Sequence, residues 1–211
     1  MSLLFLDCET IPRQDLSPNP SMVKAPANYK KEEAIKKYQE EHAEEAYRKL
    51  ALDPFGAQII VIAAAWNDGD IVSFYGEDER QVIFSFNMWL ASLDTNTPAY
   101  ARGLCGFNIA NFDAPMLYLR GCKYGAIHVS DITNKKPFDE QLYDVMRMAF
   151  PTKRNEYVSM DVLCRFFGME GKEGIDGSMV YDMYKAGKIE EIRTYCESDV
   201  DKTRQLYNIL K

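Results

Sequence analysis

The sequence contains few of the residues that build histidine- or cysteine-based sites. Its 211 residues include two histidines and five cysteines, and no two cysteines form a Cys-x-x-Cys pair. The scarcity of histidine argues against most histidine metal centres and catalytic triads. Scattered cysteines argue against a zinc site and favour a reducing compartment, so we expect a cytoplasmic protein.

Long apolar runs and an excess of positive charge are missing as well. Residues 3–6 are apolar but end at Asp7 and follow no basic segment, which argues against a signal peptide. Residues 59–66 are far shorter than the roughly 20 residues of a membrane helix, so we expect no membrane association. The 25 Lys and Arg against 32 Asp and Glu give a net charge of −7. This balance argues against tight coating of nucleic acid, but not against an enzyme that holds it through metal ions.

The sequence does contain enough apolar residues, 46%, to form a sizeable core. The length predicts one domain over residues 1–211, with residues 13–56 as an insertion after the first strand. This insertion begins with prolines and continues as a charged helix over about residues 30–52, with six basic and six acidic side chains. Such a balance is typical of a solvated helix with i,i+4 ion pairs, while a substrate-facing role stays open.

Apolar periodicity predicts an α/β fold with a mixed sheet. The second and third expected strands form a hairpin; the strands are residues 3–6, 59–66, 71–75 and 100–107. The expected helices are residues 79–93, 113–121, 159–168, 176–186 and 188–210. Residues 138–149 fit either a strand that ends near Tyr143 or a single helix.

Three acidic motifs are candidates for a site. Asp7 and Glu9 lie two residues apart at the end of the first strand, so their side chains share one side. Two such carboxylates repel each other unless a cation lies between them, although a solvated strand end also explains them. Asp113 precedes Ala114 and Pro115, which favours a helix N-cap but is compatible with a metal site.

The third motif is Tyr195 with Asp199, which share a face of the last helix. Asp199 lies at the edge of an apolar stripe, where a carboxylate needs a partner, either a metal ion or a Lys or Arg. Tyr157 and Asp161 repeat the spacing. Because Ser159 fits an N-cap and acids are favoured in a first helical turn, we interpret Asp161 as structural.

In this order, Asp7-x-Glu9, Phe112-Asp113 and Tyr195-x-x-x-Asp199 resemble the exonuclease motifs of the DEDD superfamily. The surrounding strings resemble in particular the exonuclease domain of family B DNA polymerases and its stand-alone phage and microbial relatives. The resemblance covers about residues 1–12 and 56–211. Thr194, not histidine, stands five residues before Asp199, so the tyrosine variant (DEDDy) fits and the histidine variant does not.

This resemblance implies a ribonuclease H-like fold, in which helices flank a mixed five-stranded sheet and a helical insertion follows the first strand. It implies a 3′-5′ exodeoxyribonuclease that removes nucleoside monophosphates, preferably from single-stranded DNA, by two-metal-ion hydrolysis. Asp7, Glu9 and Asp199 would bind one Mg²⁺ or Mn²⁺, while Asp7 and Asp113 would bind a second, Asp113 directly or through water. Tyr195 is a poor base, since a free tyrosine has a pKa near 10, and we expect it to orient the attacking water.

Substrate contacts are expected from four further residues. Phe107 and Phe112 can stack on terminal bases, although core positions suit them equally well. Asn108 and Thr10 are expected to contact the terminal nucleotide. We expect a monomer that binds a DNA 3′ terminus, in the host cytoplasm if a phage encodes it. A DNA polymerase or replication protein would act as a separate chain.

Alternatives stay open. The chain could be an exoribonuclease, a ribonuclease H-type endonuclease, or a non-catalytic nucleic-acid-binding module on the same fold. The presence of all four carboxylates and the tyrosine argues against the last. Two basic pairs, Lys135 with Lys136 and Lys153 with Arg154, fit either contacts to the nucleic-acid backbone or solvated loops.

Overall fold

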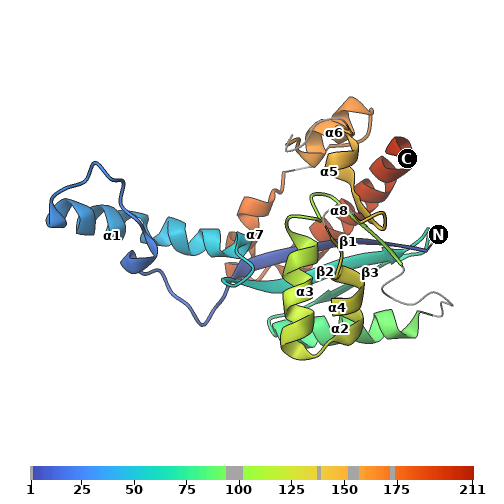
Figure 1. Cartoon of the computed structure of the whole chain (residues 1–211), viewed down its shortest axis with the longest axis horizontal. Coiled ribbons are helices and arrows are strands. Elements are labelled where there is room, and N and C mark those ends of the chain that lie inside the picture. The colour runs from blue at the N-terminus through green and yellow to red at the C-terminus, as the bar shows by residue number, and fades with distance from the viewer. Residues whose placement is uncertain (1, 94–101, 137–138, 152–156, 172–173) are drawn as a thin grey trace. The chain divides into compact units, whose positions relative to one another are not determined.

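A computed structural model describes residues 2–93, 102–136, 139–151, 157–171 and 174–211. A five-stranded sheet with the order β3-β2-β1-β4-β5 forms its centre (Figure 1). β1 pairs with β4 and β4 with β5 in parallel, whereas β2 and β3 are antiparallel. The predicted α/β fold with a mixed sheet is therefore confirmed. The strands are β1 (Leu3–Pro12), β2 (Ala57–Trp66), β3 (Ile71–Tyr75), β4 (Gly103–Gly106) and β5 (Leu142–Asp144).

The helices agree with the apolar periodicity in position and differ mainly at their ends. They are α1 (Glu32–Lys49), α2 (Glu79–Ser92), α3 (Asp113–Tyr124), α4 (Ile127–Thr133), α5 (Val145–Met148), α6 (Met160–Phe166), α7 (Val180–Lys185) and α8 (Ile189–Leu210). Short 3-10 turns are η1 (Pro20–Met22), η2 (Leu50–Leu52) and η4 (Gly177–Met179).

The structure corrects one prediction, decides between two alternatives and adds one helix. β1 continues to Pro12, so Asp7 and Glu9 lie within the strand and not at its end. The ambiguous segment is strand β5 followed by the short helix α5, because Asp144 ends the strand in an extended conformation. Helix α4 was not predicted. It has only seven residues and begins two residues after Gly125, which ends α3 in a left-handed conformation. Tyr100 and Ala101, the first residues of one expected strand, lie outside the described residues.

Helices cover both faces of the sheet, as the side chains of β3 show. Phe74 points toward α2, where its ring centroid lies 5.6 Å from that of Phe86. The preceding Ser73 points the other way, and its hydroxyl donates to Glu197 of α8 at 2.6 Å. Because successive strand side chains alternate, α2 covers one face of the sheet and α8 the opposite face (Figure 1).

A buried ion pair connects strand β2 with helices α2 and α3. The Glu79 carboxylate, on α2, accepts hydrogen bonds from Arg120 Nε at 2.6 Å and from the Ile59 backbone N–H at 2.9 Å. The Tyr124 hydroxyl donates to its other oxygen at 2.7 Å. The buried acid is thus neutralised and hydrogen-bonded, as its removal from water requires.

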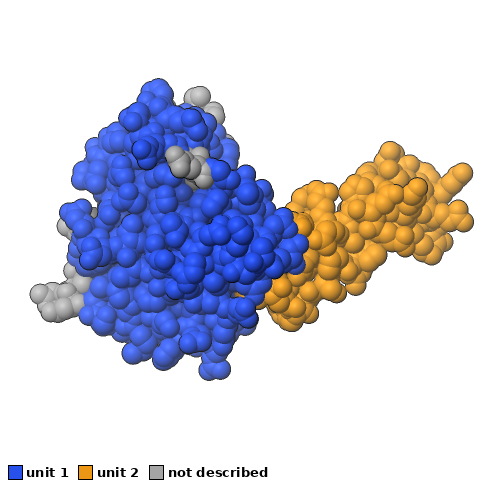
Figure 2. Space-filling view, turned by 180° about the vertical axis from the view of Figure 1, so that it is seen from behind, with its two compact units in different colours: residues 1–9, 59–211 blue, residues 10–58 orange. Residues whose placement is uncertain are grey.

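The chain divides into two compact units, residues 1–9 with 59–211 and residues 10–58 (Figure 2). The second unit nearly coincides with the expected insertion over residues 13–56. The prediction of a single domain stays a prediction. No helix within the described part of the chain is both long and apolar enough to cross a membrane.

Helix α1 of the second unit has the charge pattern that its sequence predicts. Exposed i,i+4 ion pairs lie along the surface of the helix, among them Glu32 with Lys36 at 2.9 Å and Glu45 with Lys49 at 2.6 Å. Its buried residues are Ala43 and Tyr47. Exposed pairs of this kind contribute little to stability, and their exposure shows that α1 is a largely solvated helix.

Candidate active site

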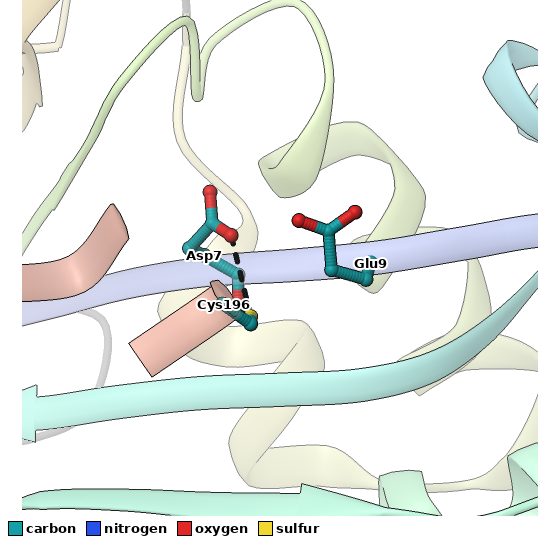
Figure 3. A group of neighbouring side chains, drawn as sticks. All are labelled: Asp7, Glu9 and Cys196. Carbon is teal, nitrogen blue, oxygen red and sulfur yellow. Dashed lines mark hydrogen bonds between the residues drawn. The ribbon is translucent and has the colours of Figure 1, made fainter. Parts of the chain in front are cut away.

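Strand β1 directs Asp7 and Glu9 toward helix α8. Phe5, two residues before Asp7, contacts Tyr207 of α8 with ring centroids 5.5 Å apart. Residues two apart on a strand share a side, so Asp7 and Glu9 face α8 as well. Figure 3 shows both carboxylates on the same side of β1. The alternation expected from the sequence therefore determines which helix these acids meet.

Helix α8 brings Tyr195, Cys196 and Asp199 to this strand. Asp199 is 4% exposed, and the Cys196 thiol donates to an Asp7 carboxylate oxygen at 3.3 Å. Burial, the charges of Glu9, Asp199 and Asp7, and a hydrogen bond with Asp199 all raise the pKa of Tyr195. Tyr195 therefore keeps its proton at neutral pH and is a hydrogen-bond donor at this site.

Asp113 joins the cluster from the first residue of α3. Its carboxylate is 2% exposed and accepts the Cys8 backbone N–H at 3.0 Å, between the two acids of β1. Phe112 occupies the N-cap position without a side-chain cap, so the N-cap interpretation of Asp113 is wrong. The carboxylate thus connects the start of α3 to β1.

Burial and neighbouring charges raise the pKa of two of these acids. Burial raises the pKa of Asp7 well above its usual value, and the charges of Asp113, Glu9 and Asp199 raise it further. Burial also raises the pKa of Asp113 to about 7, although hydrogen bonds from Cys8 lower it in part. No Lys or Arg of the described residues forms an ion pair with Asp7 or Asp113. Oxygen donors with this mutual repulsion fit divalent cations such as Mg²⁺ or Mn²⁺.

Cys196 lies close enough to this cluster to be considered as a ligand. One ligand atom each of Asp7, Glu9 and Cys196 lies within 4.8 Å of the others. Burial and the neighbouring carboxylates, however, raise the pKa of its thiol well above the usual value, and the thiol donates to Asp7. Because only a thiolate binds metal, we assign Cys196 the role of a hydrogen-bond donor that orients Asp7.

All four carboxylates line one cleft of about 570 Å³. Tyr195 lines it too, and so do Phe107, Asn108 and Phe112, which the sequence singled out as substrate contacts. A second cleft, of about 620 Å³, shares Tyr195 with the first but contains none of the four acids. The first cleft is therefore the candidate active site.

The remaining sequence candidates lie as follows. The Thr10 hydroxyl is buried and donates to the Ala51 carbonyl at 2.7 Å, and Thr10 is not among the cleft residues. Ser159 caps α6 by accepting the Val162 N–H at 3.3 Å, as predicted. Asp161 pairs with Arg165 at 2.9 Å, which agrees with a structural role, but it also lines the cleft.

The structure describes only the first of the two basic pairs. Lys135 Nζ donates to the Gln141 side chain at 2.9 Å, which agrees with a structural role. Lys153 and Arg154 lie outside the described residues.

Sequence analysis missed Asp144, the last residue of β5. It is 4% exposed, and its two oxygens accept backbone N–H groups of the loop before α3. Burial raises its pKa, whereas these hydrogen bonds and Arg147 lower it. The only sequence signal is an acid at the end of an apolar segment, which many strand ends share.

Fold and site together define an α/β protein with a carboxylate cleft at the end of its central strands. The chain belongs to the family of predicted 3′-5′ exonucleases related to the exonuclease domain of PolB, whose model matches residues 58–210. That match begins after Asp7 and Glu9, so the assignment of these two acids depends on the sequence motif and on the geometry. A search of curated proteins finds no match.

The structure is similar to that of the family B DNA polymerase from the hyperthermophilic archaeon Pyrobaculum calidifontis, with a TM-score of 0.63 and 18% sequence identity. The match covers 99% of this chain and 24% of the polymerase chain. Similarity at this identity shows the fold alone. The chain therefore has the ribonuclease H-like fold that the motifs predict, and it spans about a quarter of the polymerase's length.

Proposed function

We propose that this protein is a metal-dependent 3′-5′ exonuclease of the tyrosine (DEDDy) type that degrades single-stranded DNA from its 3′ end. The observation that carries the proposal is the convergence of Asp7, Glu9, Asp113 and Asp199 from three elements in one cleft, next to Tyr195. Family membership supports the 3′-5′ exonuclease activity. The choice of DNA, the preference for single strands and the metal dependence are our inference.

The four acids would hold two divalent ions. Asp7, Glu9 and Asp199 would bind the first, and Asp7 with Asp113 the second. When bound, such ions supply positive charge at the attacking and leaving oxygens of an in-line displacement. The raised pKa values of Asp7 and Asp113 support this role, since an added cation would relieve the repulsion that causes part of the shift in Asp7.

Tyr195 would orient the attacking water. Its raised pKa excludes a role as general base at neutral pH, but its hydroxyl is a hydrogen-bond donor and acceptor beside Asp199. A tyrosine four residues before the last carboxylate distinguishes this variant from the histidine type. The side chain would therefore fix the position of the nucleophile while the carboxylates hold the ions.

The substrate strand would lie along the loop before α3. Phe107 and Phe112 are both partly exposed in the cleft, which supports stacking on terminal bases. Asn108 lies between them in sequence and lines the same cleft. Single strands can offer unstacked bases to such side chains, whereas a duplex must first open, which is why we propose a preference for single strands.

One gel tests this proposal. Single-stranded DNA, a 3′-recessed duplex and RNA of matched sequence, each labelled at the 5′ end, are incubated with Mg²⁺, Mn²⁺ or a chelator. We expect successive shortening from the 3′ end, fastest on single-stranded DNA, and no reaction with chelator. An Asp7→Ala variant is the control for contaminating nucleases.

Other outcomes of the gel would replace the proposal. Faster degradation of RNA than of DNA would indicate an exoribonuclease. Internal cleavage of a strand with a blocked 3′ end would indicate an endonuclease. Absence of degradation with either metal, together with no gain in Tm on titration with Mn²⁺, would indicate a non-catalytic binding module.

A further inference from the structure

The loop between β4 and α3 carries three residues of the cleft, and one of them has an unusual backbone conformation. It places Phe107, Asn108 and Phe112 in the cleft, immediately before Asp113. Asn108 has a φ of 58°, in the left-handed region that most side chains avoid. Asparagine tolerates this region best among residues other than glycine, but the conformation still has to be held by its surroundings.

The Asp144 carboxylate binds the backbone of this loop with both oxygens. One oxygen accepts the Asn108 N–H at 3.0 Å, and the other accepts the Ala110 N–H at 3.3 Å. β5 is in parallel register with β4, with Asp144 opposite Gly106, so the acid lies where the loop leaves the sheet. A carboxylate that is 4% exposed pays a large desolvation cost, which these N–H groups offset.

Side chains close this contact into a ring. Arg147 Nε lies 3.6 Å from the second Asp144 oxygen, and the same guanidinium donates to Asn111 Oδ1 at 2.9 Å. The Asn111 amide in turn donates to Asn108 Oδ1 at 2.9 Å. The side-chain oxygen of Asn108 is thus engaged within the loop, and Asn108 also lines the cleft, where its NH₂ group is the remaining donor of the side chain.

We infer that Asp144 is a positioning residue of the active site, which holds the β4–α3 loop so that Asn108 presents a hydrogen-bond donor to the bound strand. This inference rests on the proposed function, because it assigns Asn108 a contact with the nucleic acid. Asp144 itself does not line the cleft. It acts through the loop, and the acceptor that Asn108 recognises is an oxygen or ring nitrogen of the terminal nucleotide.

Amide hydrogen exchange tests the loop contact without any need for activity. In an Asp144→Asn variant one side-chain oxygen is replaced by an NH₂ group, which cannot accept an N–H. We expect exchange at Asn108 or Ala110 to accelerate at least about tenfold, the effect of losing one hydrogen bond to a charged group. Glu79→Gln is the matched control, because Glu79 is also a buried acid that accepts a backbone N–H and pairs with an arginine. Unchanged exchange in Asp144→Asn, or equal acceleration in Glu79→Gln, would overturn the inference.

Steady-state kinetics tests the consequence for substrate. With a short single-stranded DNA, we expect Asp144→Asn and Asn108→Ala each to raise KM at least about tenfold, with a smaller fall in kcat. The KM of the double variant should lie within about twofold of the KM of the more strongly impaired single variant, because both substitutions remove the same contact. Glu79→Gln should keep both constants within about twofold at a temperature below its Tm.

The hydrogen-exchange experiment and the kinetic experiment can each give a negative result independently of the other. Effects of Asp144→Asn and Asn108→Ala that multiply would overturn the inference, because independent residues act additively in free energy. A wild-type protein that degrades no substrate would refute the proposed function. In that case the exchange arm still decides whether Asp144 holds the loop.

Discussion

Glu79 and Asp7 are both acids of the same unit, but their surroundings differ. Glu79 receives Arg120 Nε at 2.6 Å, and Lys123 Nζ lies 3.8 Å from its other oxygen. The charges that act on the pKa of Asp7 are those of three further acids, and each of them raises it. The protein thus supplies cations to the buried Glu79 and more negative charge to the half-buried Asp7.

This difference separates a structural acid from one that we propose as a metal ligand. A buried carboxylate beside arginine contributes to the packing of β2, α2 and α3, and its ion pair is complete within the chain. The cluster around Asp7 is electrostatically unfavourable as long as all its acids are charged, and it gains from an added cation. Stability and function therefore respond in opposite ways to substitutions in the two places.

The largest expected effect is the loss of activity in Asp7→Ala. Asp7 is the acid assigned to both ions, so we expect no detectable turnover of single-stranded DNA with Mg²⁺ or Mn²⁺. In chelator the Tm should equal or exceed that of the wild type, because one of the mutually repelling charges is gone. A gel assay and a thermal melt measure the two effects. Residual activity near that of the wild type would refute the assignment of the site.

Tyr195→Phe should separate rate from metal affinity. The substitution removes the hydroxyl beside Asp199 but none of the four carboxylates. We expect kcat to fall roughly 10²-fold, the typical contribution of one positioned group. The Mn²⁺ affinity, measured by calorimetry, should stay within about threefold, since tyrosine is assigned to the water. Equal losses in rate and in metal affinity would show that Tyr195 acts by holding the ion site.

Arg120→Met tests the structural member of the comparison. It leaves Glu79 buried, with the half-exposed Lys123 as its remaining ion-pair partner among the described residues. Removing one partner of a buried pair costs about 3–5 kcal/mol of unfolding free energy, measurable by urea denaturation. Activity per folded molecule should not change. A loss below about 1 kcal/mol would mean that the pair is no more important than a surface ion pair.

Local periodicity accounts for what the sequence could predict of this site. Alternation on a strand places Asp7 and Glu9 on one side, and the spacing of Tyr195 and Asp199 places them on one face of a helix. That these two faces meet depends on packing between residues almost two hundred positions apart. Only the order of the motifs, as a resemblance to known exonucleases, predicted the meeting.

Other features depend on contacts that no local pattern encodes. Asp144 reaches the loop before α3 because β4 and β5 are in parallel register, and the partners are 34 and 36 residues apart. Thr10 looked like part of the first motif, but the continuation of β1 to Pro12 buries its hydroxyl against Ala51. Asp113 looked like a helix cap because Pro115 follows it closely, whereas the N–H that it accepts belongs to Cys8, 105 residues away.

Measured over one pH unit, the smallest effect in this comparison is the pH dependence of stability due to Asp113. Its pKa is about 7 in the folded protein, and the unfolded value is near 3.9. Between these values the folded state keeps a proton that the unfolded state has released, so in chelator stability should fall as pH rises, by up to about 1.4 kcal/mol per pH unit. Asp113→Asn keeps an acceptor for the Cys8 N–H but does not titrate, and should reduce this slope. Saturating Mn²⁺ should reduce it in the wild type as well, because the ion stabilises the charged carboxylate in place of the proton. An identical slope in the variant and the wild type would show that Asp113 is already charged in the metal-free protein, and the contrast with Glu79 would then have to rest on Asp7 alone.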